Sequence, residues 1–316
     1  MPEGFARRKQ SFLIEALNMR FCYLSSQATV PDAEDAGVER RGDAFEHDQM
    51  MEALRAALKA QAGAAARFDD IAWDSEAADW SSYDAVMIGT TWDYWDRKSE
   101  FLAKLEEIDG KTALFNPLSL VEWNLHKSYL RDLETKGARI LPTLWLDKAD
   151  EAAALAAFDD LGSDDLVFKR QVGAGAEGQF RLARGAPVPD MPHPMMVQRF
   201  EPAILSEGEQ SYIFIDGQFS HALTKHAARG DYRIQSSYGG YEKPLHPDGS
   251  DLEAARKILE ALDTVPLYAR IDMLRASDGG LMLMELEMVE PFLYPLQGPD
   301  LGKRVVAALV QQTGKG

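Results

Sequence analysis

The stretch 270-RIDMLRASDGGLMLMELEMVEP-291 carries acidic side chains in segments that otherwise read as buried strands. It predicts a β-hairpin with strands at Tyr268–Leu274 and Leu281–Met288, joined by an Asp-Gly turn. Glu285 and Glu287 are two residues apart, so they project from the same face of the second strand. The hairpin can bring Asp272, from the first strand, across from them.

Three carboxylates on one face repel one another and lose hydration, so this arrangement needs positive charge nearby. A hard divalent cation such as Mg²⁺ prefers oxygen ligands of this kind, especially together with phosphate oxygens. The alternative is a solvated outer face whose acids bind nothing. The hairpin by itself leaves both interpretations open.

The composition limits the class of protein. The chain has 316 residues, of which 46% are hydrophobic and 27% charged, as in a soluble globular enzyme with two or more lobes. The 51 acidic and 34 basic residues give a net charge of −17, which argues against nucleic acid and anionic membranes as partners but allows a local basic cleft. The single cysteine, Cys22, excludes an internal disulfide and fits a reducing cytoplasm. No apolar run reaches the length of a transmembrane span.

Four parts follow one another along the chain. Residues 1–18 are an N-terminal extension without a convincing signal peptide, and the true start is either Met1 or Met19. Residues 19–115 alternate strands and helices, which is typical of a parallel sheet covered by helices. Residues 116–197 form a central lobe and residues 198–316 a C-terminal lobe. The predicted fold class is α/β and α+β.

The predicted elements are read from periodicity and from turn residues. The strands include Arg20–Ser25, Ala85–Gly89 and Leu166–Arg170, and a hairpin covers 211-SYIFIDGQFSHAL-223. The helices include His47–Ala62, Lys98–Ile108, one continuous helix over 116–137 closed by Gly137, and Glu151–Phe158, interpreted as solvated surface.

A lysine and three glycines lie where one strand ends, in 167-VFKRQVGAGAEGQ-179. Glycines let backbone N–H groups fold closely over an anion, and Lys169 adds a point charge for phosphate. The pattern is neither a P-loop nor a dinucleotide-binding fingerprint. Gly173, Gly175 and Gly178 therefore predict either a cover for phosphate groups or an ordinary turn.

The order of these features resembles the ATP-grasp superfamily, and the matching elements cover roughly residues 116–295. The resemblance implies an N-terminal parallel α/β domain followed by two lobes that clamp ATP. It is strongest to the branch that contains glutathione synthetase and D-alanine ligase. The segments 91-TWDYWDR-97 and 285-ELEMVEP-291 are also similar to the ATP-grasp enzyme that closes the ring in D-cycloserine synthesis.

The resemblance assigns residues to the nucleotide. It implies two lysines, a mobile glycine loop over the phosphates, a hinge that offers backbone groups to adenine, a ribose-binding acid and a further lysine near the phosphates. The matching positions are Lys127 and Lys169, Gly173, Gly175 and Gly178, Gln198, Arg199 and Phe200, Glu209 with Glu207 as its fallback, and Lys225.

The resemblance also assigns the acids of the hairpin to metal. Asp272, Glu285 and Glu287 match the magnesium ligands, with two ions implied and Mn²⁺ as an alternative metal. In many ligases of this family the last ligand is Asn. Glu287 departs from that pattern, adds negative charge and can change the number of ions or the preferred metal.

The implied chemistry is the activation of a carboxylate. A substrate carboxylate attacks the γ-phosphate to give an acylphosphate and ADP, and an amine or similar nucleophile then displaces phosphate. Arg270 is expected to stabilise the transferring phosphoryl group. Arg233, in 229-RGDYRIQSSYGG-240, either binds the substrate carboxylate or belongs to a surface salt bridge.

Two further groups of residues leave two interpretations each. Ser236 and Ser237 either complete an acceptor pocket or belong to a plain loop. Trp92, Tyr94 and Trp95 follow a buried strand at the edge where α/β sheets bind ligands. They either line a pocket for the second substrate or pack between lobes.

Three functions are consistent with these residues. One is an ADP-forming ligase for small amino-acid-like carboxylates and amines, including an intramolecular ring closure. The second is a ligase that adds amino acids to a polypeptide. The third is a non-catalytic, nucleotide-responsive binding protein, which the full set of three acids and four bases disfavours. We expect ATP and Mg²⁺ as cofactors, a cytoplasmic location and no nucleic-acid or membrane partner, and a homo-oligomer is one option for its assembly.

Overall fold

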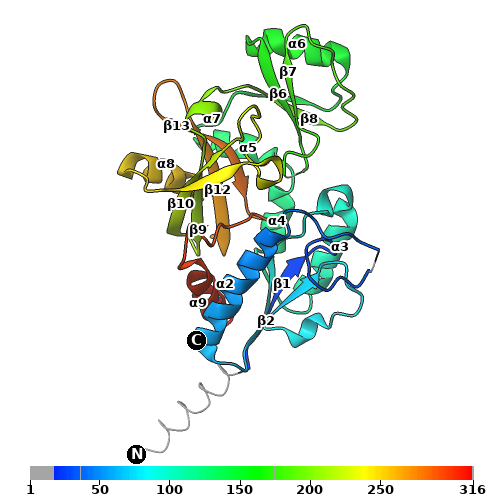
Figure 1. The fold of residues 1–316 in the computed structure, drawn as a ribbon, viewed down its shortest axis with the longest axis vertical. Coiled ribbons are helices and arrows are strands. Elements are labelled where there is room, and N and C mark those ends of the chain that lie inside the picture. Colours follow the sequence, from blue (N-terminus) through cyan, green and yellow to red (C-terminus); the bar gives the residue numbers. More distant parts are fainter. Residues whose placement is uncertain (1–17, 36, 174, 315–316) are drawn as a thin grey trace, which may run out of the picture.

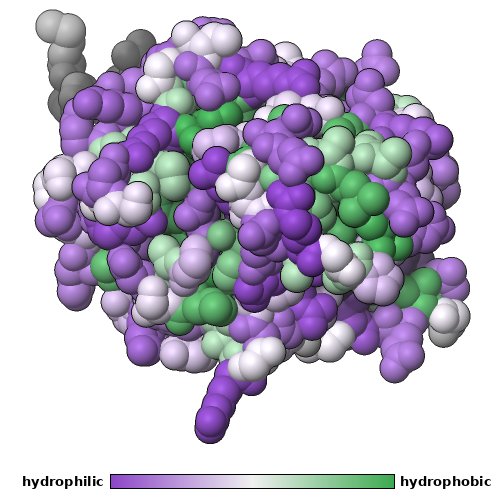
Figure 2. Space-filling model, turned by 90° about the horizontal axis from the view of Figure 1, so that it is seen from above, coloured by the Kyte–Doolittle hydropathy of each residue, from purple (hydrophilic) through white to green (hydrophobic). Residues whose placement is uncertain are grey.

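The computed structural model describes residues 18–35, 37–173 and 175–314, and the predicted extension 1–18 falls outside them apart from its last residue. Three sheets follow one another along the chain, each covered by helices (Figure 1). Viewed from above, the surface is mainly hydrophilic, with smaller groups of hydrophobic side chains between the polar ones (Figure 2). None of the described helices is long and apolar enough to cross a membrane.

The first sheet is parallel and has the strand order β2-β1-β3-β4. Its strands are β1 (Arg20–Ser25), β2 (Arg67–Ala72), β3 (Ala85–Ile88) and β4 (Ala113–Phe115). Helix α2 (Phe45–Ala62) covers the face that carries Phe21 and Tyr23. Helix α3 (Lys98–Asp109) covers the other face, where Cys22 and Leu24 are buried. Successive residues of β1 thus enter two different cores, as expected for a strand of a parallel sheet.

The last helix of the chain, α9 (Leu301–Gln312), returns to the first sheet and packs beside α2 (Figure 1). Gly302 permits the close approach, since a Cβ at this position would lie 2.3 Å from the Ala53 carbonyl oxygen. Residues from the end of the chain therefore complete the core under the N-terminal sheet.

The second sheet is antiparallel and has the order β5-β8-β6-β7. Its strands are β5 (Thr143–Leu146), β6 (Asp165–Arg170), β7 (Phe180–Ala183) and β8 (Met195–Arg199), and helix α6 (Glu151–Leu161) packs on it. The interpretation of this helix as solvated surface is wrong for one of its faces. Ala154, Ala157, Phe158 and Leu161 are buried, and they follow the spacing that places residues on one side of a helix.

The single helix predicted over 116–137 is also wrong. The segment forms two short helices, α4 (Leu118–Asn124) and α5 (Tyr129–Thr135). Between them the Lys127 backbone N–H donates to the Gln171 carbonyl oxygen at 2.9 Å instead of continuing a helix. A contact with a distant part of the chain thus overrides the local helical pattern and fixes the backbone of Lys127 beside the end of β6.

The third sheet is antiparallel and has the order β11-β10-β9-β12-β13. Its strands are β9 (Glu209–Ile215), β10 (Gln218–His226), β11 (Tyr241–Leu245), β12 (Tyr268–Arg275) and β13 (Leu281–Glu287). Both predicted hairpins, β9–β10 and β12–β13, are confirmed. Helix α8 (Gly249–Glu260) packs on this sheet, and the short helix α7 (Ala203–Ser206) leads into β9.

Candidate functional site

The outer edge of β13 is covered by polar side chains from α4 and α5. The Asn124 side chain donates to the Leu286 carbonyl oxygen and accepts from the Met288 N–H, both at 2.8 Å. The Tyr129 hydroxyl accepts from the Leu286 N–H at 2.9 Å. An edge strand with satisfied backbone groups is held firmly, so the acidic side chains of β13 start from a fixed backbone.

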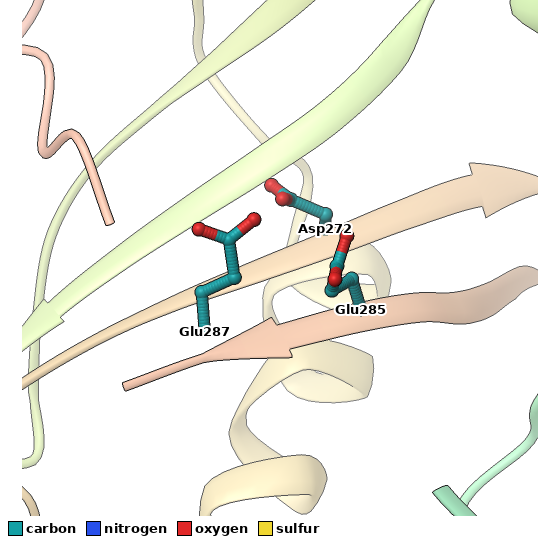
Figure 3. Close-up of side chains that lie close together, drawn as sticks. All are labelled: Asp272, Glu285 and Glu287. Atoms are coloured by element: carbon teal, nitrogen blue, oxygen red, sulfur yellow. The ribbon is translucent and has the colours of Figure 1, made fainter. Parts of the chain in front are cut away.

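The three acids of the hairpin lie together (Figure 3). Asp272 pairs in register with Glu285, and a bulge follows between Asp272 and Met273. One carboxylate oxygen each from Asp272, Glu285 and Glu287 lies within 4.8 Å of the others. The prediction that the hairpin gathers these acids on one face is confirmed. Asp272 is only 1% exposed, so a solvated outer face is wrong for this residue.

Each of the three acids has a basic partner. Asp272 lies between Arg270, whose Nε is 3.0 Å away, and Lys225, whose Nζ is 3.1 Å away. Arg270 also pairs with Glu287, and Lys127 pairs with Glu285. The mutual repulsion of the acids is therefore offset by bases of the same chain, which are the bases expected to bind phosphate.

The charges of this cluster stabilise one another. Burial disfavours the charged form of Asp272, but Arg270 and Lys225 outweigh that cost and lower the pKa of its carboxyl group. Ser211 also donates a hydrogen bond of 2.5 Å to Asp272. Burial likewise opposes the charge of Lys225, while Asp272 and Glu209 raise its pKa. Asp272 therefore stays ionised, as a metal ligand must be.

The donor set fits a magnesium ion. Carboxylate oxygens are the ligands that Mg²⁺ prefers, usually from one or two side chains together with phosphate oxygens. Asp272, Glu285 and Glu287 offer such oxygens from two adjacent strands. The bases that pair with them lie within reach of any phosphate group bound at the same place.

Lys169, on β6, differs from the other bases because it forms no ion pair within the described residues. Its pKa is lowered to about 8, chiefly because burial disfavours its charge and also because Lys127 and Lys225 lie nearby. Glu209 acts in the opposite direction. A partly buried lysine without a paired carboxylate is a strong ligand for an added anion.

A cavity lies between the three parts of the chain and contains most of the predicted site. Its lining includes Lys127, Lys169, Gly173, Gly175, Gln198, Arg199, Phe200, Glu209, Lys225, Arg233, Arg270, Asp272, Glu285 and Glu287. The structure thus brings together residues that are widely separated in the sequence. Two predicted residues, Gly178 and Glu207, do not line this cavity.

Local contacts explain why Glu207 and Gly178 lie outside the cavity lining. Glu207 is exposed and pairs with Arg275 at 3.3 Å, so the fallback for the ribose-binding acid lies outside the cavity. Glu209 is 6% exposed and pairs with Lys225. Gly178 has a φ of 64° and packs on Arg170, where an added Cβ would lie 2.9 Å from Cδ. Gly178 therefore packs against Arg170 and allows the loop its positive φ.

The predicted hinge lies at the end of β8. The Gln198 side chain donates to the Thr143 hydroxyl at 2.9 Å, and the Phe200 N–H donates to the Asp165 carbonyl oxygen at 2.9 Å. The Arg181 guanidinium lies 3.4 Å from the centre of the Phe200 ring. This segment is thus fixed by contacts on both sides.

The N-terminal part contributes a wall of the cavity that sequence reasoning missed. Arg41, Asp43 and Glu46 line it, at the start of α2 and just before it. Glu46 accepts a hydrogen bond from the Ser236 hydroxyl. Its pKa is raised to about 7, chiefly by burial. These two residues are 190 positions apart, so no local pattern could have linked them.

In the aromatic segment after β3, two side chains line the cavity and one packs between the parts of the chain. Trp92 and Trp95 line the cavity. Tyr94 instead packs between the parts, where its hydroxyl donates to the Glu290 carboxylate at 3.0 Å. The Trp92 indole N–H donates to the Glu290 carbonyl oxygen at 3.1 Å. Burial and the nearby Glu287 raise the pKa of Glu290 to about 8.

The loop 229–240 places Arg233 both in the cavity lining and in an ion pair, and its binding of a substrate carboxylate stays a prediction. This residue lines the cavity and also pairs with Asp231 at 2.7 Å. Its guanidinium lies 3.7 Å from the centre of the Tyr238 ring. Ser236 lines the same cavity, and the side chain of Ser237 lies outside the part of the chain that the structure describes.

Comparison with known proteins gives a consistent result. A family model described as the N-terminal domain of D-cycloserine synthetase DcsG matches residues 25–116. The cycloserine biosynthesis protein DcsG of Streptomyces lavendulae is 28% identical over 261 residues, which are 76% of this chain and 87% of that protein. The crystal structure of D-cycloserine synthetase DcsG matches with a TM-score of 0.76 and 24% identity, over 93% of this chain and 99% of that one.

Two other solved structures are similar over nearly the whole chain. D-alanine–D-alanine ligase from Bacillus anthracis complexed with ATP has a TM-score of 0.64 at 14% identity, over 94% of this chain and 98% of that one. The ATP-grasp ligase PsnB, complexed with a variant of its minimal precursor, Mg and ADP, has a TM-score of 0.59 at 18% identity, over 94% and 99%. The chain has the ATP-grasp fold.

The ATP-grasp fold accounts for the order of the three sheets. The parallel sheet precedes the two antiparallel ones, as expected for an N-terminal α/β domain followed by two lobes. The predicted fold class and the resemblance to ATP-grasp ligases are confirmed. The resemblance to the cycloserine-forming enzyme is also borne out, since DcsG is similar in both sequence and structure.

Proposed function

We propose that this protein is an ATP- and Mg²⁺-dependent ligase that activates a small amino-acid-like carboxylate as an acylphosphate and releases ADP and phosphate. Its relatives are ATP-grasp ligases, and solved members of the fold bind ATP, or Mg together with ADP. The roles of individual residues given below are part of this proposal.

The observation that carries the proposal is the arrangement of charge in the cavity. Lys127, Lys169, Lys225 and Arg270 converge in a protein whose net charge is −17. Four bases beside a cluster of three acids suit a triphosphate with its metal ion. When bound, Mg²⁺ would be held by Asp272, Glu285 and Glu287 and would neutralise phosphate charge; one ion or two, and Mn²⁺ in its place, are compatible with these ligands.

The proposed reaction has two steps. An oxygen of the substrate carboxylate bonds to the γ-phosphorus while the bond to the β,γ-bridging oxygen breaks, so that ADP leaves. A nitrogen nucleophile then bonds to the acyl carbon, phosphate leaves with the carbon–oxygen electron pair, and the nitrogen loses a proton. Arg270 would bind the transferring phosphoryl group, and Arg233 would bind a carboxylate bidentately. The other lining residues position the substrates and exclude water.

The similarity to DcsG supports a substrate that carries both the carboxylate and the nucleophile, so that attack within one molecule closes a ring. The matched family model covers the N-terminal domain, which supplies the cavity wall with Glu46 and Trp92. Shared structure at this wall favours a small substrate over a polypeptide. Ring closure requires only that the chain between the two groups can fold back on itself.

The test is ATP turnover with pooled small amino acids, supplied with and without pooled amines. We expect ADP and phosphate, and ring closure is indicated when a single amino acid supports turnover without added amine and gives a product made of one substrate molecule less one water. Substrate labelled with ¹⁸O in its carboxylate should transfer one label to phosphate, and hydroxylamine should trap the acyl group as a hydroxamate. Glu285→Gln is the matched background control. AMP and pyrophosphate, or ATP binding without cleavage, would contradict the proposal.

A further inference from the structure

Tyr294 combines a strained backbone with a place in the cavity lining. Its φ is 53°, in the left-handed region that bulky side chains rarely adopt. The residue lines the cavity and is 7% exposed. A backbone of this kind costs free energy and persists only where the surroundings determine it, which is most often at functional sites. Tyr294 is therefore a candidate for a role in the reaction.

The segment around Tyr294 is held from two sides. The Tyr294 carbonyl oxygen accepts from the Gly298 N–H at 3.1 Å, and Gly298 packs directly on His221, since an added Cβ would lie 2.1 Å from Nδ1. On the other side, Arg270 Nη1 donates to the Phe292 carbonyl oxygen at 3.1 Å. The ring centres of Phe292 and Tyr294 are 4.6 Å apart. These contacts fix the Tyr294 ring relative to Arg270.

The Tyr294 hydroxyl has no hydrogen-bond partner among the residues that the structure describes, although the residue is almost fully buried. Two other buried tyrosines differ in this respect. The Tyr94 hydroxyl donates to the Glu290 carboxylate at 3.0 Å, and the Tyr268 hydroxyl donates to the Val289 carbonyl oxygen at 2.9 Å. A hydroxyl without a protein partner in a cavity is available to a bound molecule, as donor and as acceptor.

The charged groups of the site act on this hydroxyl. Burial raises the pKa of Tyr294, the charges of Lys225 and Arg270 act in the opposite direction, and Asp272 adds to the rise. The hydroxyl therefore keeps its proton and can donate it in a hydrogen bond. The Tyr294 ring centre lies 5.8 Å from the Arg270 guanidinium carbon. The hydroxyl thus lies near the base that would bind the transferring phosphoryl group.

We propose that the Tyr294 hydroxyl donates a hydrogen bond to the acyl oxygen of the acylphosphate while the nitrogen nucleophile attacks. The nitrogen bonds to the acyl carbon, and the π pair of the carbonyl group moves onto this oxygen, which becomes negatively charged. The pair then returns, phosphate leaves with the electrons of its bond to carbon, and the nitrogen loses a proton.

Tyr294 keeps its own proton throughout this step. A fixed donor stabilises the charge that develops on the oxygen more than it stabilises the uncharged carbonyl group. The four bases of the cavity are assigned to phosphate, so no other donor is assigned to the acyl oxygen. This inference rests on the proposed function and adds a catalytic residue to its second step.

The test compares the two steps in Tyr294→Phe, which keeps the ring and removes only the hydroxyl. The first step is followed by the migration of ¹⁸O from the β,γ-bridge of labelled ATP to a non-bridging β-position, which requires reversible cleavage of ATP but no attack on the acyl carbon. The second step is followed by the release of phosphate and product. Both are measured with Mg²⁺ and pooled small amino acids. Tyr241→Phe makes the same change at an exposed position of β11 and serves as the matched control.

We expect Tyr294→Phe to release product about 10²- to 10³-fold more slowly, the loss that follows removal of one donor to a developing oxyanion. Isotope migration should be at least as fast as in the wild type, because the acylphosphate persists longer and returns to ATP more often. ATP affinity, measured by titration, and Tm should be unchanged. Tyr241→Phe should match the wild type in every measurement.

Unchanged product release in Tyr294→Phe would overturn the inference and leave the ligase in place. Equal losses of product release and isotope migration would also overturn it, since the side chain would then serve the first step or the fold. Should Tm fall, the ratio of the two rates still decides, because both come from the folded fraction. The proposed function is judged on the wild type: the absence of both isotope migration and ADP release would contradict the ligase, and the role of Tyr294 with it.

Discussion

Replacement of Glu46 by Gln should stabilise the ligand-free protein, and the gain should depend on pH. The pKa of Glu46 is raised from its ordinary value of 4.5 to about 7, chiefly because burial disfavours its charge. Since one pKa unit corresponds to about 1.4 kcal/mol, this rise corresponds to an upper limit of about 3 kcal/mol. Partial exposure of Glu46 reduces that figure. Gln keeps the acceptor for Ser236 and carries no charge to desolvate.

The sign follows from proton linkage. Between pH 4.5 and about 7 the folded state holds more protons on Glu46 than the unfolded state does. The free energy of unfolding of the wild type therefore falls as the pH rises through this window, and the full penalty is present above it. Glu46→Gln lacks the penalty. Its advantage should be less than half of its full size at pH 5.5 and close to its full size at pH 8.

The assay is thermal unfolding of both proteins from pH 5.5 to 8.5, without nucleotide or metal. A protein of this size shifts its Tm by about 2 °C per kcal/mol, so we expect a gain of roughly 2–6 °C at pH 8. Glu52→Gln, exposed on the same helix, controls for a change in net charge. A difference in Tm that does not vary with pH, or a less stable Glu46→Gln at pH 8, would refute the reasoning.

Four other outcomes test the nucleotide and metal assignments. Lys169→Ala should raise the KM for ATP strongly in steady-state assays. In the wild type this KM should rise above pH 8, where Lys169 loses its proton. A KM that does not vary with pH would count against a role of Lys169 in binding phosphate. Shortening the loop 173–178 should lower kcat more than it weakens nucleotide binding, since its proposed role is closure over the phosphates; turnover that survives the deletion makes it an ordinary loop. Glu287→Asn should need more magnesium for half-maximal turnover, because an amide oxygen coordinates without charge, and an unmoved magnesium titration excludes Glu287 as a ligand. Asp272→Asn should lower the Tm of the metal-free protein, since it leaves two buried bases, Lys225 and Arg270, without their shared acid. An unchanged Tm would show that repulsion among the acids cancels the attraction between Asp272 and these bases.

The cluster of Asp272, Glu285 and Glu287 could be predicted because its geometry is local. A strand repeats its facing direction every two residues, and a short turn returns the chain beside itself. The glycine loop after β6 was visible for a similar reason. Glycines at Gly173 and Gly175, which have φ values of 151° and 63°, mark a backbone that other residues rarely adopt.

The part of the N-terminal wall that Glu46 forms could not be predicted in this way. Glu46 lies on a helix whose hydrophobic periodicity identifies only the residues of the buried face. Its hydrogen-bond partner Ser236 is 190 residues away. The break between α4 and α5 has the same origin. The Lys127 N–H bonds to Gln171, and such a long-range contact leaves no trace in the helical pattern around it.

Repulsion among the acids of the hairpin is offset in a way that their own sequence does not show. Lys127 and Lys225 belong to distant segments, and no pattern within β12 and β13 indicates that they lie nearby. The structure pairs Lys127 with Glu285, and Lys225 with Asp272. Acids and bases that the resemblance assigns to separate ligands are thus paired with each other.

This pairing gives the acids a second role beside the proposed coordination of metal. Glu285 pairs with Lys127 and Glu287 with Arg270 in the cavity. Binding of ATP with Mg²⁺ would exchange partners, so that phosphates take the bases and the metal takes the acids. Buried charge then has a partner before and after binding, which limits the desolvation cost. Loss of one acid should consequently weaken metal binding and also leave a base without its carboxylate partner. Glu285→Gln therefore removes more than a metal ligand. It should weaken ATP binding by more than the loss of a magnesium ligand accounts for.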